Sequence, residues 1–417
     1  MEKLVVCGGS PLFGTVEIHG AKNGILPILA ATLLTHERCV LTGCPDLTDV
    51  SAALQILDSL HCKTEKTGGA VIIDSQNAKL CDIQPELAGK LRASLTFVGA
   101  MLAGFGRGAI ALPGGCCLGG RPIDYHLQAL KKMGVKFDCD SEMLRFSWEE
   151  KRGGFITLPY PSVGATENIL LAACAVPEPV TVRGAAREPE IRELCRFLTA
   201  AGIKICGIGT DVLTVFGGEK MHGAAFHILP DRMEAATYLS MAAACGGRIT
   251  LKNVRQEHLC AVISALREAG CKIICEEKEI TLERSGELFP VKITTDTYPD
   301  FPTDAQAPLM AAVLTANGES HITETVFPKR FAHVPQFRKF GAQISVQGRE
   351  VTVFGVPQLY AAQAEAPDLR GGAGVLIAAL CAAGKSEIAG ADCMRRGYAD
   401  FISQLRRLGA ALYAEKS

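Results

Sequence analysis

The sequence has little of what marks a nucleic-acid, metal or membrane protein. Of its 417 residues one is tryptophan, and the net charge is −1. A nearly neutral chain lacks the strong basic field on which nucleic-acid binding relies. Neither a Cys-x-x-Cys nor a His-Glu-x-x-His spacing occurs, so a zinc site has no support. The longest uncharged apolar run, from Gly371 to Gly384, is too short to cross a bilayer.

Cysteine, in contrast, is abundant and odd in number, with 17 residues. The N-terminus has no basic stretch followed by a long apolar run, so no secretory signal is predicted. Most cysteines lie in apolar contexts, such as those of Cys174 and Cys381. We interpret them as small buried hydrophobic residues in a reducing cytoplasm rather than as a disulfide framework.

One short pattern recurs along the whole chain, six times at intervals of 68 to 73 residues. A helix-like segment ends in glycine, and a short apolar strand pattern follows. Glycine suits this position because a helix often ends with a residue at positive φ. Fixed-period similarity of this kind predicts six copies of one supersecondary unit. The residues at this position are His61 in the weakest copy and Gly134, Gly202, Gly270, Gly341 and Gly409 in the others.

An alanine-rich helix that is apolar nearly all round recurs with the same period, so each copy should be buried within a domain. Its polar residues gather at the N-terminal end. Aspartate, serine or threonine there has a simple alternative role as an N-cap. Capping does not explain Lys22, Arg92 or Arg370, because the helix macrodipole disfavours cations at that end. Such cations beside exposed N–H groups suit a bound anion, above all phosphate.

Three units around a pseudo-threefold axis would form one domain, and six would form two. A break near Leu229-Pro230-Asp231 predicts a first domain of residues 21–229 and a second of residues 1–20 plus 230–417. If the buried helices point their N-termini the same way, their polar ends line a cleft between the domains, and we expect the active site there.

The segment from Leu112 to Asp124 is the most unusual stretch, because four glycines flank Cys116 and Cys117. Glycines placed so closely suggest a tight turn or a close approach to a ligand. The guanidinium of Arg121 would favour an anion or a thiolate nearby. A surface loop with two incidental cysteines is the alternative.

Ten short motifs, in one order over essentially the full length, resemble those of the enolpyruvyl transferases. The resemblance implies an α/β fold of two domains, an inside-out α/β barrel with six βαβαββ-type repeats, three per domain. The motifs are Gly20-Ala21-Lys22-Asn23, Leu91-Arg92-Ala93-Ser94, the Cys116 loop through Asp124, Ser162-Val163-Gly164-Ala165-Thr166, Ala186-Arg187-Glu188-Pro189-Glu190, Leu229-Pro230-Asp231-Arg232, Phe301-Pro302-Thr303-Asp304, Thr323-Glu324-Thr325-Val326-Phe327, Asp368-Leu369-Arg370 and Arg396-Gly397-Tyr398.

The Lys22-Asn23 and Cys116 motifs are most similar to the branch that acts on a UDP-sugar. This implies that phosphoenolpyruvate and UDP-N-acetylglucosamine give enolpyruvyl-UDP-N-acetylglucosamine and phosphate, the first committed step of peptidoglycan synthesis. The resemblance implies small-molecule substrates alone, with no cofactor, metal, nucleic acid, membrane or obligate protein partner, and a cytoplasmic location. Fosfomycin, an epoxide expected to mimic the donor, should label the loop cysteine.

The resemblance also implies roles for individual residues. Cys116 matches the acid that protonates the vinyl carbon, and Asp304 matches the base beside the attacking hydroxyl, although it could also be an N-cap. The positions that match anion-binding cations are Lys22, Arg92, Arg121, Arg330, Arg370 and Arg396. Those that match nucleotide contacts are Arg121, Pro122, Ile123, Asp124, Ser162, Val163 and Gly164, and those near the sugar are Asn23 and Val326.

Several residues depart from the family pattern. Cys117 duplicates the thiol, Tyr160 replaces a lysine and Arg395 replaces an aspartate. Gly371 and Gly372 replace an Ala-Ser pair, which is expected to loosen the helix start. These departures leave two alternatives open. One is a non-catalytic or regulatory paralogue that binds UDP-N-acetylglucosamine, and the other is a transferase of the 5-enolpyruvylshikimate-3-phosphate synthase type.

Overall fold

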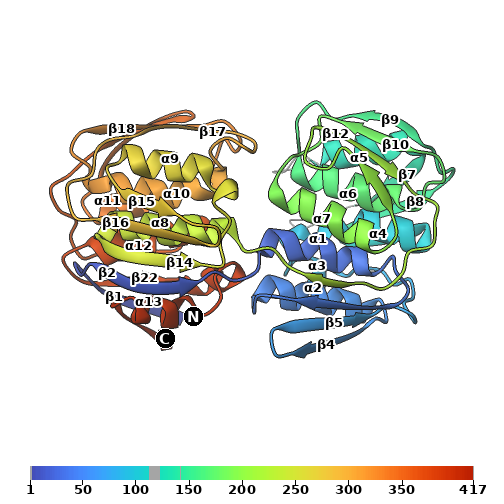
Figure 1. Ribbon diagram of the computed structural model, residues 1–417, viewed down its shortest axis with the longest axis horizontal. Helices are drawn as coiled ribbons and strands as arrows, with labels where there is room; N and C mark the ends of the chain where they lie inside the picture. The colour runs from blue at the N-terminus through green and yellow to red at the C-terminus, as the bar shows by residue number, and fades with distance from the viewer. Residues whose placement is uncertain (1, 112–122, 141, 417) are drawn as a thin grey trace. The chain divides into compact units, whose positions relative to one another are not determined.

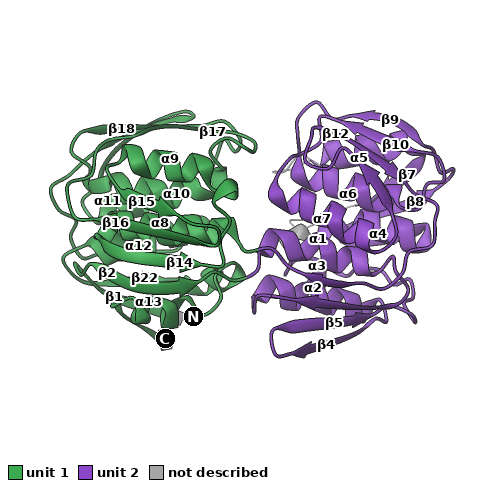
Figure 2. Ribbon diagram, in the orientation of Figure 1, with its two compact units in different colours: residues 1–19, 230–417 green, residues 20–229 purple. Residues whose placement is uncertain are grey.

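The structure is a computed structural model that describes residues 2–111, 123–140 and 142–416. Four residues with predicted roles or departures, Cys116, Cys117, Arg121 and Pro122, lie outside this described part. The chain forms two compact units, coloured separately in Figure 2. Unit 1 comprises Met1–His19 and Pro230–Ser417, and unit 2 comprises Gly20–Leu229.

Unit 2 places small sheets outside a group of buried helices (Figure 1). The buried helices are apolar on every side because each packs against further helices or strands; all residues from Gly24 to Thr32, for example, are buried. The buried helices are α1 (Lys22–Thr32), α4 (Thr96–Phe105) and α6 (Val163–Ala173); the others are α2 (Thr48–Ser59), α3 (Pro85–Ala88), η1 (Arg92–Leu95), α5 (Asp124–Lys132) and α7 (Pro189–Ala200).

Each four-stranded sheet of unit 2 combines one parallel pair with antiparallel neighbours. In the three-stranded sheet, a parallel bridge between Ile83 and Ile110 stands in place of the fourth strand. The strand orders are β13 (Ala225–His227), β3 (Arg38–Thr42), β5 (Ala70–Asp74), β4 (Lys63–Thr67); β11 (Lys204–Cys206), β12 (Val212–Phe216), β10 (Val180–Arg183), β9 (Gly154–Thr157); and β6 (Arg107–Ala111), β8 (Met143–Trp148), β7 (Val135–Cys139).

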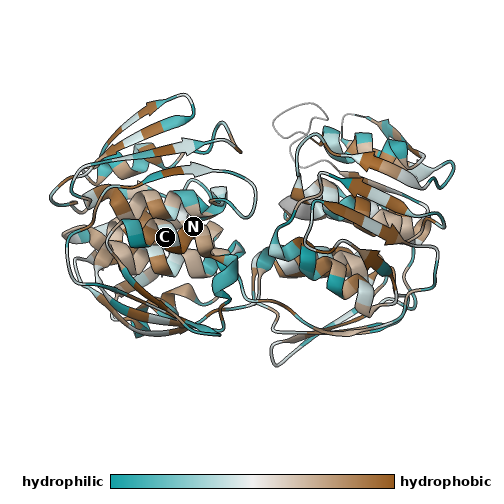
Figure 3. Ribbon diagram, turned by 45° about the horizontal axis from the view of Figure 1, so that its top comes forward, coloured by the Kyte–Doolittle hydropathy of each residue, from teal (hydrophilic) through white to brown (hydrophobic). Residues whose placement is uncertain are grey.

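Unit 1 repeats this plan, with three buried helices that pack on one another: α8 (Arg232–Cys245), α10 (Thr303–Ala312) and α12 (Leu369–Cys381). Figure 3 shows that the helices inside each unit are predominantly hydrophobic. The other helices are η2 (Gln256–His258), α9 (Cys260–Glu268), η3 (Val313–Thr315), α11 (Val334–Lys339), η4 (Ala391–Arg396) and α13 (Phe401–Arg407).

The N-terminal segment supplies strands to two sheets of unit 1. β2 (Leu12–Glu17) pairs in parallel with β14 (Gly247–Lys252), whereas β1 (Glu2–Gly8) lies between β22 (Gly384–Ala389) and β23 (Ala411–Lys416) and pairs antiparallel with both. The sheets are β21 (Gln363–Glu365), β22 (Gly384–Ala389), β1 (Glu2–Gly8), β23 (Ala411–Lys416); β15 (Lys272–Cys275), β16 (Glu279–Arg284), β14 (Gly247–Lys252), β2 (Leu12–Glu17); and β17 (Lys292–Thr295), β18 (Glu319–Glu324), β20 (Glu350–Phe354), β19 (Gln343–Gln347). The α/β fold of two three-part bodies agrees with the sequence prediction.

The predicted helix ends are confirmed in all six copies. The five glycines have φ between 90° and 106°, and His61 adopts φ 64°. After His61, Gly202, Gly270, Gly341 and Gly409 the next residue donates its N–H to the carbonyl five positions back, as in Ala410 N–H to Leu405 O at 3.0 Å. The repeat therefore depends on a left-handed residue at the end of each outer helix.

Cysteine burial was over-predicted. Among the residues that the structure describes, fourteen cysteines carry free thiols, and five of these, Cys39, Cys62, Cys174, Cys195 and Cys271, are buried. Cys7, Cys206 and Cys260 are exposed, because they lie on outer strands or helices although their sequence neighbours are apolar. Within the described ranges no helix combines the length and the apolar character needed to cross a membrane.

Gly409 offers a direct test of the helix-end requirement. Its φ is +94°, and a Cβ there would meet no atom within 4 Å, so Gly409→Ala adds backbone strain without a clash. We expect the free energy of unfolding to fall by about 1 kcal/mol in urea denaturation. Gly286→Ala is the control, since its Cβ also points into open space without a positive φ. Equal stability of the two variants would contradict the role of Gly409.

Candidate functional site

In unit 2, the polar N-terminal ends of the buried helices carry most of the predicted substrate contacts. Lys22 and Asn23 open α1, where Ala21 provides no side-chain cap. The Nζ of Lys22 lies 3.0 Å from Oδ2 of Asp49, and both side chains are largely buried. Asp49, in the first turn of α2, was missed because its position in sequence is that of an ordinary helix-start aspartate. The Asp49 carboxylate holds the Lys22 ammonium group in place, and the net charge of the pair is zero.

Helix α6 begins at Val163, directly after Ser162. Ser162 is its N-cap, and its Oγ accepts from the Ala165 N–H at 3.4 Å. The first turn therefore contains Val163 and Gly164, two predicted nucleotide contacts. Glu167 consequently lies inside the helix and not at its end.

His126 joins α5 to this helix start. Its Nδ1 lies 2.9 Å from Nδ2 of Asn168, an amide that donates, so the imidazole accepts there. Burial lowers the pKa of His126 to about 4, which keeps the ring neutral. A Cβ on Gly164 would come within 2.9 Å of the ring, so the imidazole packs directly against that glycine. The imidazole of His126 thus accepts a hydrogen bond from α6, and this contact brings α5, which begins at Asp124, beside residues 162–164.

Arg92 lies in η1, which contacts both α4 and α6. Ile123 is buried before α5, and Asp124 at its first position is exposed. Tyr160, the predicted departure, is half-buried, and its carbonyl accepts from the Ser162 N–H at 2.7 Å. The structure thus brings the α5 and α6 contacts together, while Lys22 is held by α2.

A buried carboxyl group in unit 2 was not predicted. Burial raises the pKa of Glu167 to about 8, with further contributions from Glu190 and Glu188, although the Thr96 hydroxyl donates to it at 3.2 Å. The sequence signal was weak, because one glutamate within an apolar helix does not show which acidic residues of another segment lie near it.

Glu167 should make stability depend on pH. Its folded pKa of about 8 exceeds the unfolded value of 4.5, so the folded protein binds the extra proton and stability falls as pH rises between these values. The slope is about 1 kcal/mol per pH unit. We expect Glu167→Gln, which retains an acceptor for Thr96, to flatten this dependence in urea denaturation from pH 5 to pH 8. The control Glu178→Gln alters an exposed carboxylate and should leave the slope unchanged; a flat profile in the wild type would refute the assignment.

In unit 1, three predicted residues meet directly. Asp304 accepts from Arg330 Nη2 at 2.6 Å through Oδ1 and from Arg370 Nε at 3.2 Å through Oδ2. Pro302 occupies the N-cap position of α10, so the alternative role of Asp304 as N-cap does not hold. We call these three residues the Asp304 triad. Two guanidinium groups and one carboxylate give it a formal charge of +1.

Arg370 is the most enclosed member of the triad, with 3% of its surface exposed. Burial lowers the pKa of Arg370, but Tyr398, Asp304 and Asp231 outweigh burial and raise the pKa above its usual value. Its guanidinium lies 5.3 Å from the Tyr398 ring centroid, and the Tyr398 hydroxyl lies 2.9 Å from that of Thr237. Within the described part of the chain, its Nη1 is buried without a hydrogen-bond partner. A permanently charged, buried donor of this kind suits an anionic acceptor.

Glu324 positions the loop that carries Val326 and Arg330. Its carboxylate is fully buried and accepts from the N–H groups of Val326 and Phe327, both at 2.9 Å, and from the Thr303 hydroxyl at 2.9 Å. It therefore joins the end of β18 to the first residue of α10, beside Asp304. Glu324 lies in one of the ten motifs, but no role was predicted for it.

The predicted looseness of the α12 start is wrong. Asp368 caps the helix and accepts from the N–H groups of Arg370 and Gly371, both at 3.0 Å. A Cβ on Gly371 would lie 2.8 Å from Pro367, and one on Gly372 would lie 2.9 Å from the Ala366 side chain. The glycines thus allow close packing of the first turn.

The last predicted cation, Arg396, is half-buried at the end of η4, an element that packs on α12. Arg395 is exposed. The helix that bears Arg370 is therefore also in contact with the segment that bears Arg396.

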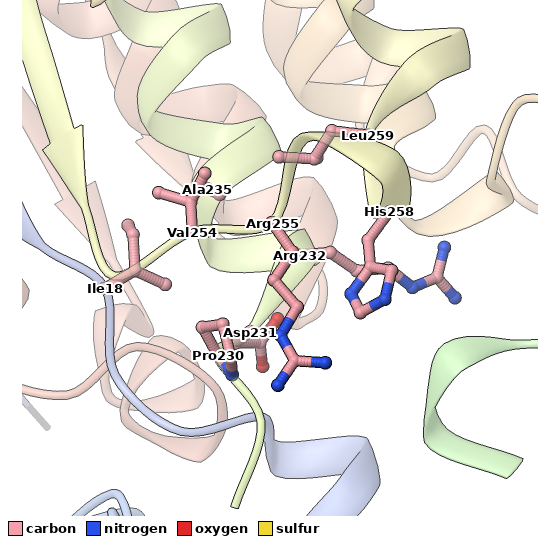
Figure 4. A pocket seen from close by; sticks show the side chains of 9 residues that line it. All are labelled: Ile18, Pro230, Asp231, Arg232, Ala235, Val254, Arg255, His258 and Leu259. Atoms are coloured by element: carbon pink, nitrogen blue, oxygen red, sulfur yellow. The ribbon is translucent and has the colours of Figure 1, made fainter. Parts of the chain in front are cut away.

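Asp231 caps the third buried helix of unit 1, α8, and accepts from the N–H groups of Met233 and Glu234 at 2.7 and 3.0 Å. Figure 4 shows Arg232, Arg255 and His258 beside it, around a hollow with otherwise apolar walls. The hollow has no room for a water molecule, so these residues form packing around the helix start and not a ligand cavity.

Comparison with known proteins now identifies the family. A family model described as EPSP synthase (3-phosphoshikimate 1-carboxyvinyltransferase) matches residues 6–405. The chain belongs to the EPSP synthase family of enolpyruvyl transferases. This membership confirms the resemblance predicted from the ten motifs.

Two curated relatives within this family are similar over nearly their whole length. UDP-N-acetylglucosamine 1-carboxyvinyltransferase 2 of Caldanaerobacter subterraneus subsp. tengcongensis is 40% identical over 98% of this chain and 99% of its own. UDP-N-acetylglucosamine 1-carboxyvinyltransferase of Finegoldia magna is 41% identical over 98% of both chains.

Solved enolpyruvyl transferases share the fold. The enolpyruvyl transferase NikO from Streptomyces tendae superposes with a TM-score of 0.90 at 20% identity, covering 100% of this chain and 99% of its own. EPSP synthase from Acinetobacter baumannii superposes with a TM-score of 0.78 at 18% identity over the whole of both chains. At these identities the likeness establishes the two-domain α/β fold.

Proposed function

We propose that this protein transfers the enolpyruvyl group of phosphoenolpyruvate to the 3'-hydroxyl of UDP-N-acetylglucosamine and releases phosphate, the first committed step of peptidoglycan synthesis. One observation carries the proposal: the relatives that bear this enzyme's name match about 40% of residues over nearly the full chain. Both substrates are cytoplasmic metabolites, so the proposal places the protein in the cytoplasm.

The Asp304 triad supports the donor half of this proposal. Phosphoenolpyruvate carries a phosphate and a carboxylate, and the buried Nη1 of Arg370 is a cationic donor without a partner among the described residues. We assign Arg330, Arg370, Arg396 and Lys22 to the donor's anionic groups, together with the predicted Arg92 and Arg121. Fixed cations stabilise the charge that develops when phosphate leaves.

The first turn of α6 supports the acceptor half. Anionic groups bind favourably at helix N-termini, where backbone N–H groups are exposed. We assign the nucleotide part of the acceptor to Ser162, Val163 and Gly164, with Ile123 and Asp124 from the neighbouring α5 and the predicted Arg121 and Pro122. Asn23 and Val326 are assigned to the sugar.

The chemical step needs an acid and a base. In the proposed mechanism, the Cys116 thiol protonates the vinyl carbon while the sugar hydroxyl attacks the adjacent carbon, and Asp304 accepts the hydroxyl proton. The tetrahedral intermediate then expels phosphate, while the Cys116 thiolate takes back a proton from the new methyl group, which restores the double bond, and the proton held by Asp304 passes to the departing phosphate or to solvent. The Cys116 assignment rests on the family motif, since this residue lies outside the described part.

Phosphate release tests the function. Purified protein should release phosphate from phosphoenolpyruvate only when UDP-N-acetylglucosamine is present. Binding of the nucleotide sugar without phosphate release would favour a regulatory paralogue, and turnover with shikimate 3-phosphate in its place would favour the other branch.

Cys116→Ser should reduce this turnover about a hundredfold or more, because the hydroxyl is a much weaker acid than the thiol. The matched variant Cys117→Ser should keep it. Covalent labelling by fosfomycin, followed by mass spectrometry, should disappear only in Cys116→Ser. Full labelling of that variant would move the acid to Cys117.

Asp304→Asn should slow turnover about a hundredfold or more, because an amide cannot accept the hydroxyl proton. Binding of UDP-N-acetylglucosamine, measured by calorimetry, should be retained. Turnover at the wild-type rate would remove Asp304 from the role of base.

A further inference from the structure

The contacts of Asp304 within the triad oppose its proposed role as a base. Both carboxylate oxygens of Asp304 are engaged by guanidinium groups, Oδ1 by Arg330 at 2.6 Å and Oδ2 by Arg370 at 3.2 Å. A base must offer a lone pair to the proton that it accepts. Charge-assisted hydrogen bonds to two arginines stabilise the ionised carboxylate and make that lone pair less available.

The same two arginines are the cations assigned to the donor's anion. An anion that approaches them competes with Asp304 for their N–H groups. Arg370 still has Nη1 to offer, a buried donor without a partner among the described residues, and this gives the anion an initial point of attachment. The triad carries a net charge of +1, so a dianionic phosphoryl group is attracted although the carboxylate is present.

We propose that Asp304 acts as an internal anion that holds Arg330 and Arg370 until a phosphoryl or carboxylate group replaces it, and that this replacement frees Asp304 to act as the base. The role of Asp304 as base rests on the proposed function. The exchange of anions rests only on the contacts of Asp304 with Arg330 and Arg370. It couples donor binding to activation of the acceptor hydroxyl.

The surrounding structure supports an exchange at Asp304 rather than a collapse of the site. Arg370 is held by Tyr398 and by its place in the first turn of α12, whose cap is Asp368. Two N–H groups of the loop that bears Arg330 donate to Glu324, which also accepts from the Thr303 hydroxyl of α10. The side chain of Asp304 is 29% exposed, whereas that of Arg370 is 4% exposed. The Asp304 carboxylate therefore has more room to turn away than the Arg370 guanidinium.

Inorganic phosphate is the probe that tests the exchange, with the full-length protein and binding followed by calorimetry. Asp304→Asn removes the competing charge with little change of shape, so phosphate should bind about tenfold more tightly than to the wild type. Asp300→Asn makes the same change of charge at an exposed residue four positions earlier and should alter the affinity less than twofold. Equal affinity of Asp304→Asn and wild type, or an equal gain in both variants, would overturn the proposal.

A second variant locates the phosphate. Arg370→Gln combined with Asp304→Asn should abolish the gain, whereas a gain that persists would place the anion elsewhere and overturn the proposal. The turnover assay is separate: failure of phosphate release from phosphoenolpyruvate would refute the proposed function, and the phosphate affinities would still decide whether Asp304 competes with an anion.

Discussion

The buried cation of Arg370 is the element on which the unit 1 site depends. A guanidinium cannot lose its proton in a protein, so its burial has to be compensated by neighbouring charge and polar groups. Asp304, Tyr398 and Asp231 supply that compensation. The contacts that fix Arg370 therefore also fix the starts of the buried helices α8, α10 and α12. Packing and site chemistry share the same residues.

In unit 2, neutral polar groups stabilise the packing of α4, α5 and α6. Its helix starts are held by a neutral network, in which Asn168 accepts from Gly99 and donates to His126 and to Leu95. Burial keeps His126 uncharged, and burial also raises the pKa of Glu167 so that it binds a proton near neutral pH. At the start of α1 the Lys22 cation is balanced within the unit by Asp49. Repeats of one plan thus carry different electrostatic environments at corresponding ends.

The fold was largely predictable because its signals are local and repeated. Helices that are apolar on every side had to be buried, and a glycine after each outer helix required a left-handed residue, as Gly134 and Gly270 show. In the sequence Ser162 and Gly164 resemble loop residues, and only the cap geometry shows that Ser162 caps α6 and that Gly164 lies in its first turn. Cysteine exposure was misjudged because the residues next to Cys206 and Cys260 in sequence do not report which face of the element turns outward.

The site was only partly predictable, because a single sequence does not show which side chains from distant segments contact one another. Helix-start cations pointed to Lys22 and Arg370, and the resemblance assigned Arg370 and Asp304 to one active site, but the direct contact between these two residues, 66 positions apart, was not predicted. Asp49 and Glu324 were missed because their roles depend on which loops fold together.

The central place of β1 in its sheet has a consequence for the order in which the chain matures. Unit 2 is one continuous segment whose final strand, β13, completes the sheet of β3, so every part of it has been synthesised by residue 229. The strand β1 is synthesised before unit 2, whereas both of its neighbours, β22 and β23, are synthesised after unit 2. On the ribosome β1 must therefore remain without these partners until more than 370 further residues have been made, which makes it a target for chaperones that recognise extended apolar segments.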